Sequence, residues 1–231
     1  KMGQNMQKVG KNLTVGLTAP IVAFGAIALK NWDQQEKAIA QVEAGLQSTG
    51  NAVGYTSEQL QKMAADLQNN SLFGDEEILQ GATAQLLTFT NIAGTQFART
   101  QQAAIDLSTR LGGDLKSASI QLGKALNDPV ANLSALSRSG IQFSKEQKTV
   151  INSLVATNKL ADAQTIILDE LEKQYGGAGA AAAKAGLGPF KQLSNTLGDL
   201  AEDFGAIIAE YLLPFVSKIK ELAASFKALS P

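Results

Sequence analysis

Hydrophobic side chains recur along most of this chain at intervals of three and four residues, which places them on one face of an α-helix. Runs of alternating apolar and polar residues bounded by hairpin turns, the mark of strands, do not stand out. With the capping signals described next, the spacing predicts helices over residues 20–48, 57–69, 75–89, 95–111, 114–126, 129–138, 145–157, 159–175 and 189–229. We therefore predict an all-α fold: a helical bundle of short capped helices followed by a long C-terminal amphipathic helix.

Short polar side chains mark the expected helix starts, because the first N–H groups of a helix need acceptors outside it. Thr56 with Gln59, and Ser144 with Gln147, match the reciprocal capping box. Three prolines are suited to the first turn of a helix: Pro20, Pro129 and Pro189. Five glycines are suited to helix ends: Gly112, Gly113, Gly140, Gly176 and Gly177.

The C-terminal helix carries the clearest periodic pattern. Its apolar positions step by three and four, then resume after additional steps of four around Pro214, where a kink is expected. The stripe consists of Phe190, Leu193, Leu197, Leu200, Phe204, Ile207, Tyr211, Phe215, Ile219, Leu222 and Phe226, and continues to Leu229. We call these residues the seam. A heptad seam is typical of self-association in a coiled coil, and the alternative is a long helix folded back on its own bundle.

A Gly/Ala-rich segment at 176–188 separates this helix from the rest of the chain. It mixes strong helix formers with helix breakers, so we expect a flexible junction. The expected organisation is a helical domain over 1–175 with an apolar N-terminal helix, the junction over 176–188, and a coiled-coil-like helix over 189–231. The start at Lys1 and the end at Pro231 suggest a piece of a longer protein.

The N-terminal stretch 13–29 contains no charged residue, and residues 1–32 carry lysines but no acid. A signal peptide and a transmembrane helix are two interpretations. Pro20 interrupts the apolar run, however, and its pattern continues into an amphipathic helix. We favour a buried helix whose alanine face packs closely on a neighbour. Exposure of the same helix would let it enter a membrane through Ile21, Val22, Phe24, Ile27 and Leu29.

Composition excludes several kinds of chemistry. The chain has no His and no Cys, which removes Cys/His zinc sites, Ser-His-Asp triads and cysteine nucleophiles. Its net charge is -1 without a basic cluster, so sequence-specific nucleic-acid binding is not expected. Acids occur together at 75–77, 169–172 and 202–203, but the first group suits a helix N-terminus and the others lie on predicted solvent faces. We predict no catalytic residue, no metal site and no cofactor: the protein is not an enzyme.

Several segments resemble the tape-measure proteins of long-tailed phages, in the order in which that family has them. They are LTAPI (17–21), LGKALNDP (122–129), GIQFS (140–144), QK (147–148), AQ (163–164), IL (167–168), YGG (175–177) and GPFKQL (188–193). The capped, turn-rich first two thirds of the chain resemble the family's N-terminal conserved region rather than its repetitive ruler.

The resemblance implies a structural protein of a phage or prophage tail. Such a protein would lie in the tail lumen of the virion, contact tail tube and tail tip proteins, set tail length during assembly in the bacterial cytoplasm and assist genome ejection. It also implies contact with the host membrane on ejection, while the seam favours a homo-oligomer. The alternative function is a membrane-active helical protein that forms a passage in the host envelope.

Overall fold

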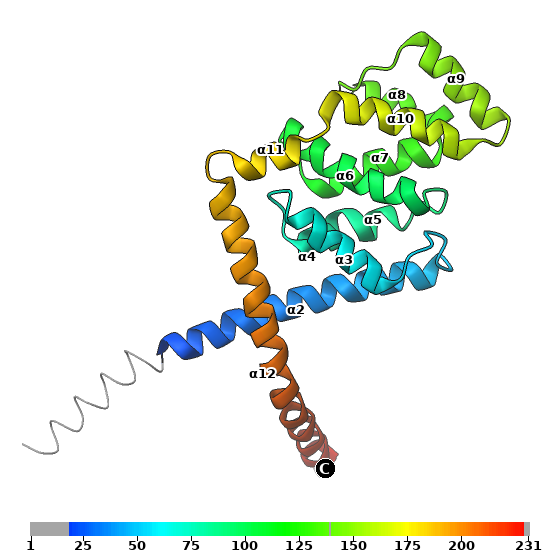
Figure 1. Ribbon diagram of the computed structural model, residues 1–231. Coiled ribbons are helices and arrows are strands. Elements are labelled where there is room, and N and C mark those ends of the chain that lie inside the picture. Colours follow the sequence, from blue (N-terminus) through cyan, green and yellow to red (C-terminus); the bar gives the residue numbers. More distant parts are fainter. Residues whose placement is uncertain (1–18, 139, 229–231) are drawn as a thin grey trace, which may run out of the picture. The chain divides into compact units, whose positions relative to one another are not determined.

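The computed structural model describes residues 19–138 and 140–228, and every regular element within these ranges is a helix (Figure 1). The predicted all-α class is confirmed. The elements are α2 (Ala19–Ser48), α3 (Ser57–Gln68), α4 (Asp75–Ile78), η2 (Leu79–Thr83), α5 (Ala84–Leu86), α6 (Gly94–Leu111), α7 (Leu115–Asn127), α8 (Pro129–Arg138), α9 (Lys145–Ala156), α10 (Leu160–Tyr175), α11 (Ala178–Lys184) and α12 (Gly188–Ala228).

The contacts divide the chain into two compact units. The larger unit is Lys37–Asn195, and the smaller one combines Lys1–Glu36 with Thr196–Pro231. Within the larger unit, α11 packs on α6, and the expected domain boundaries at 175 and 188 stay predictions. The N-terminal part of α12 also belongs to the larger unit. There the side-chain amide of Gln192 donates to the Asn69 carbonyl oxygen over 2.9 Å.

The core of the larger unit is built around α6, which packs against α7, α10 and α11. Phe97, Ile105 and Leu107 of α6 are buried among leucine, isoleucine and alanine side chains of the neighbouring helices. Burying side chains of this size contributes about 1.5–3 kcal/mol each, so α6 is the central support of this unit.

The predicted capping boxes are confirmed. The Thr56 hydroxyl accepts from the Gln59 backbone N–H, and the Gln59 side chain accepts in return from the Thr56 N–H. Ser144 and Gln147 repeat the arrangement at the start of α9. Each cap satisfies donors that the helix itself leaves free, which is why these boundaries could be located from the sequence to within a residue.

The predicted helix over 75–89 differs from the structure. It ends at Leu86, and a π-helical turn, η2, interrupts it between α4 and α5. In this wider turn Thr83 is fully buried, and its Oγ1 accepts a hydrogen bond of 2.9 Å from Nε2 of the buried Gln101 of α6. The spacing of apolar residues could not predict this turn, because one residue inserted into an α-helix barely changes the average period of the pattern.

The segment expected as a flexible junction contains the seven-residue helix α11. Gly179 and Ala183 are buried, and a Cβ at Gly179 would come within 2.9 Å of an Ile105 methyl carbon. The Gly179 N–H donates to Oδ1 of the buried Asp106 over 2.8 Å. A close helix contact and a buried hydrogen bond therefore order a segment whose composition suggested a linker.

Candidate interaction surfaces

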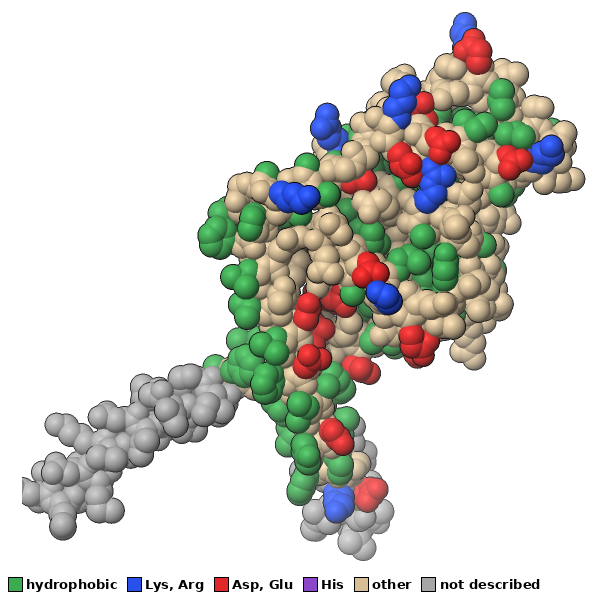
Figure 2. Space-filling view, viewed as in Figure 1, with side chains coloured by type: hydrophobic (Ala, Val, Ile, Leu, Met, Phe, Trp, Pro, Cys, Tyr) green, Lys and Arg blue, Asp and Glu red, His purple; other side chains and the backbone are tan. Residues whose placement is uncertain are grey.

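The seam lies on an exposed side of α12 throughout its described part. Between Phe190 and Phe215 each seam side chain is 46–70% exposed, whereas large apolar side chains are commonly buried. Figure 2 shows hydrophobic side chains along much of this helix. The seam side chains of Ile219, Leu222 and Phe226 lie outside the described residues. The predicted apolar stripe therefore forms a continuous exposed surface over about seven helical turns of α12.

A second face of α12 consists of small residues and packs on α2 within the smaller unit. Ala201, Gly205 and Ala209 are buried and follow each other at four-residue intervals. A Cβ at Gly205 would collide with the Ala28 carbonyl oxygen and approach the Trp32 Cβ to 2.7 Å. The missing side chain at Gly205 is thus what lets the two backbones approach.

Sequence reasoning missed this small-residue face. Its signal was present in the four-residue spacing of Ala201, Gly205 and Ala209, but the larger side chains of the seam dominated the helical pattern. Because the small-residue face of α12 packs against α2, the seam on another side of α12 stays exposed. The ring of Phe24 from α2 contacts that of Phe204 edge to face, with centroids 5.7 Å apart.

The residues predicted as a membrane-active helix are only partly covered by the structure. Phe24 and Ile27 are 45% and 54% exposed, and Leu29 is partly buried. The side chains of Ile21 and Val22 lie outside the described residues. Within the part of the chain that the structure describes, no helix combines the length and the apolar character needed to cross a bilayer.

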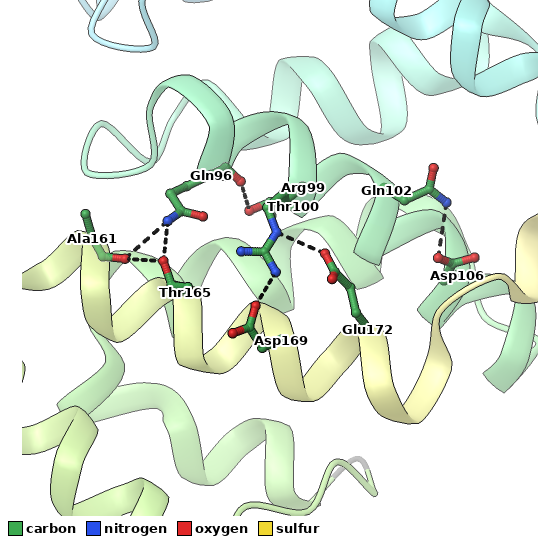
Figure 3. Close-up of polar contacts among 9 residues, drawn as sticks. All are labelled: Gln96, Arg99, Thr100, Gln102, Asp106, Ala161, Thr165, Asp169 and Glu172. Carbon is green, nitrogen blue, oxygen red and sulfur yellow. Dashed lines mark hydrogen bonds and ion pairs between the residues drawn. The ribbon is translucent and has the colours of Figure 1, made fainter.

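The acidic side chains of α10 serve helix packing. Arg99 of α6 points between two of them, with Nη2 2.6 Å from Asp169 Oδ1 and Nε 2.9 Å from Glu172 Oε1 (Figure 3). The hydrogen bond to Glu172 and that to Asp169 raise the pKa of Arg99. Gln96 extends the contact by donating to Thr165 Oγ1 over 2.7 Å. These acids join α6 to α10.

Glu170 is held by amides on the other side of the same helix. Its carboxylate accepts hydrogen bonds from Gln174 Nε2 and Gln147 Nε2, at 2.6 and 2.7 Å. Both bonds favour the charged form, so the pKa of Glu170 is lowered. The Gln147 bond also connects α9 to α10, which gives this acid a structural role between helices.

Gln164 is a further buried polar residue whose role the sequence did not indicate. Its Nε2 donates to the carbonyl oxygens of Asn91 and Leu126, over 2.8 and 3.1 Å. One amide from α10 thereby satisfies two backbone acceptors, in the loop before α6 and at the end of α7. Spacing cannot reveal such a bond, because the partners lie 73 and 38 residues away.

The acids at 75–77 begin α4, as a helix N-terminus favours. Burial raises the pKa of Glu76. It also raises the pKa of Glu77, against the opposing effect of Lys191.

Beside η2 lies a cleft of about 310 Å³, lined by Gln41, Glu77, Gln80, Gly81, Gln85, Asp114, Leu115 and Lys116. Gln80 and Gly81 of the π-helical turn line this cleft, so the spacing of apolar residues predicted neither the turn nor the cleft.

Packed helices, an exposed apolar seam and carboxylates bound to neighbouring helices define an all-helical class of protein. A family model described as prophage tail length tape measure protein matches residues 1–152. The chain belongs to this family, whose members are structural phage proteins. No curated protein matches the chain, and no solved structure matches it. The matched range includes the resembling segments 17–21, 122–129, 140–144 and 147–148.

Proposed function

We propose that this chain is an assembly segment of a prophage tail tape measure protein, which lies inside the tail tube and sets tail length as tube subunits polymerise around it. The family match over 152 of 231 residues carries this proposal. A helical protein suits the role because every helical residue adds about 1.5 Å of length with its backbone hydrogen bonds satisfied. The partners of this segment are the tail tube and tail tip proteins, and assembly takes place in the bacterial cytoplasm.

The seam is the surface through which copies of the chain associate. Its side chains from Phe190 to Phe215 are about half exposed or more, at heptad spacing that suits a helical partner. Burying a half-exposed leucine or phenylalanine side chain contributes on the order of 1 kcal/mol, so a seam of this length supports a stable homo-oligomer.

Sedimentation of the purified chain tests this surface. Leu200→Glu places a charge in the seam, and Ala206→Glu places the same charge on an exposed residue outside it. We expect oligomers for the unaltered chain and for Ala206→Glu, and monomers for Leu200→Glu. A mass unaffected by Leu200→Glu would contradict association through the seam.

The same two variants test the role in the tail. Introduced into the prophage, Leu200→Glu is expected to give particles with missing or irregular tails in electron micrographs, and Ala206→Glu tails of normal length. Uniform, normal tails with Leu200→Glu would contradict the part of the seam in tail assembly.

A second function, membrane activity during genome ejection, is favoured by the exposure of Phe24 and Ile27 at the start of α2. In this proposal, α2 inserts into the host envelope after release and helps to form a passage. Liposome leakage caused by the chain should disappear with Phe24→Glu, which replaces a large apolar side chain by a charge. It should persist with the control Ala26→Glu, which alters an exposed small residue of the same helix. Equal leakage from both variants would exclude α2 as the inserting element.

A further inference from the structure

A cleft of about 200 Å³ lies between α8 and α9, two helices that pack on each other (Figure 1). Val130, Leu133 and Ser137 of α8 line one side of this α8–α9 cleft, and Lys148 and Asn152 of α9 line the other. Leu133 is buried, whereas the apolar side chain of Val130 is 59% exposed. Pockets for small molecules have volumes of about 300–1,000 Å³, so this smaller cleft suits a few side chains of a protein partner.

The two helices that form the α8–α9 cleft carry an excess of positive charge. From the start of α8 to the end of α9, residues 129–156, the sequence has three cations, Arg138, Lys145 and Lys148, and one acid, Glu146. Lys148 lines the cleft, and Lys145 lies about one turn before it on the same face of α9. Both lysines are exposed. A partner that places apolar side chains in the cleft is therefore favoured if it carries acids beside them.

The seam of α12 combines apolar side chains with acids in this way. Between residues 192 and 217 the only charges are four acids. Asp203 and Glu210 are exposed and lie seven residues apart, so they lie along one edge of the seam, next to Phe204 and Tyr211. The seam side chains of this stretch are themselves 46–70% exposed. The seam therefore presents large apolar side chains together with negative charge.

We infer that the seam of one copy of this chain docks in the α8–α9 cleft of a second copy. In this arrangement Leu200, Phe204 and Ile207 supply the apolar side chains, and the acids at the edge of the seam lie toward Lys148. The inference rests on the proposed self-association and adds the surface that the seam meets.

Pairing between two seams is less favourable over the same stretch. Two copies joined through residues 192–217 of both would bring acids beside acids, and like charges that lie close together repel. The α8–α9 cleft instead offers cations. Docking there also leaves the small-residue face of α12 on α2, because that face lies on another side of the helix.

This contact joins two different surfaces, so every copy carries one seam and one cleft. Such a heterologous contact repeats from copy to copy, and it closes into a ring or continues as an open chain. Opposite charges at a surface attract less when salt screens them, so association should weaken as the salt concentration rises.

Mixing two defective variants of the full chain tests this contact. Leu200→Glu disrupts the seam and leaves the cleft intact, whereas Val130→Glu places a charge in the cleft and leaves the seam intact. We expect each variant to sediment as a monomer at concentrations where the unaltered chain forms oligomers. Their equimolar mixture should form dimers with one copy of each, because only one seam and one cleft remain intact. Val150→Glu is the matched control, because Val150 is a 46% exposed valine of α9 that does not line the cleft, and it should assemble like the unaltered chain.

The remaining outcomes distinguish the inference from the proposed self-association. Oligomers of Val130→Glu like those of the unaltered chain would overturn docking in the cleft, and self-association through the seam would stand. A mixture that stays monomeric would also overturn docking in the cleft. An unaltered chain that sediments as a monomer would refute both. If this monomer sediments with vesicles of anionic lipid, the membrane is the occupant of the seam.

Charge reversal at exposed residues provides a second test in case Val130→Glu disturbs folding. Lys148→Glu should weaken association about two- to fivefold, the effect expected for an exposed pair of charges. Adding Asp203→Lys to the same chain should restore part of this loss, since opposite charges then face each other again. Association of the double variant that is no stronger than that of Lys148→Glu would contradict this contact.

Discussion

Two glycines of α12 provide a direct test of the α2–α12 crossing, because the same substitution should have opposite effects at them. Gly198 and Gly205 both lie inside the helix, where alanine is favoured over glycine by about 1 kcal/mol. A Cβ at Gly198 would find its nearest neighbour, Asn31 Nδ2, at 3.8 Å, an ordinary contact. Gly198→Ala should therefore stabilise the chain by up to about 1 kcal/mol.

At Gly205 the added methyl group meets the backbone of α2. It would collide with the Ala28 carbonyl oxygen, which cannot move away as a flexible side chain could. Overpacking of this kind costs about 1–3 kcal/mol, which offsets or exceeds the gain in helix propensity. We expect Gly205→Ala to be less stable than Gly198→Ala by about 1–3 kcal/mol.

Urea denaturation of both variants and of the unaltered chain measures this difference. Amide hydrogen exchange locates it, since only Gly205→Ala should reduce protection in the first half of α2. The reasoning fails if both substitutions stabilise the chain equally and exchange in α2 is unchanged, because the backbones would then not be in close contact at Gly205.

Three further predictions concern the larger unit. Gln164→Leu leaves the carbonyl oxygens of Asn91 and Leu126 without this donor and should lower the free energy of unfolding by about 1–3 kcal/mol, against less than about 1 kcal/mol for Gln174→Leu near the surface; equal losses in urea denaturation would contradict this. Because the pKa of Glu170 is lowered in the folded state, its contribution to stability is complete above the usual carboxyl pKa of 4.5 and is lost as pH falls through the folded value. Glu170→Gln should therefore reduce the loss of stability below pH 4.5, and an unchanged acid titration of stability would refute the role of this carboxylate. Thr56→Ala should cost about 1 kcal/mol through loss of the cap, whereas Thr56→Ser should cost little; equal thermal stabilities of the two variants would argue against capping.

The sequence by itself determined the helices and most of their ends. Apolar spacing and capping chemistry act between residues three or four positions apart, so Thr56 with Gln59 and Ser144 with Gln147 locate helix starts without knowledge of the fold. The seam of α12 was also visible, because its period is a property of one helix. The family resemblance needed only the order of short segments, and the family match over 1–152 agrees with it.

Only the tertiary structure decided the features that depend on partners distant in the chain. The helix α11 within 178–184 is held by Asp106, and the π-helical turn near Thr83 contacts Gln101. The small-residue face of α12 acquired its meaning from the backbone of α2 at Ala28. Periodicity shows which side chains share a face of a helix, but it carries no information on what that face meets, because the contact energy comes from the other helix.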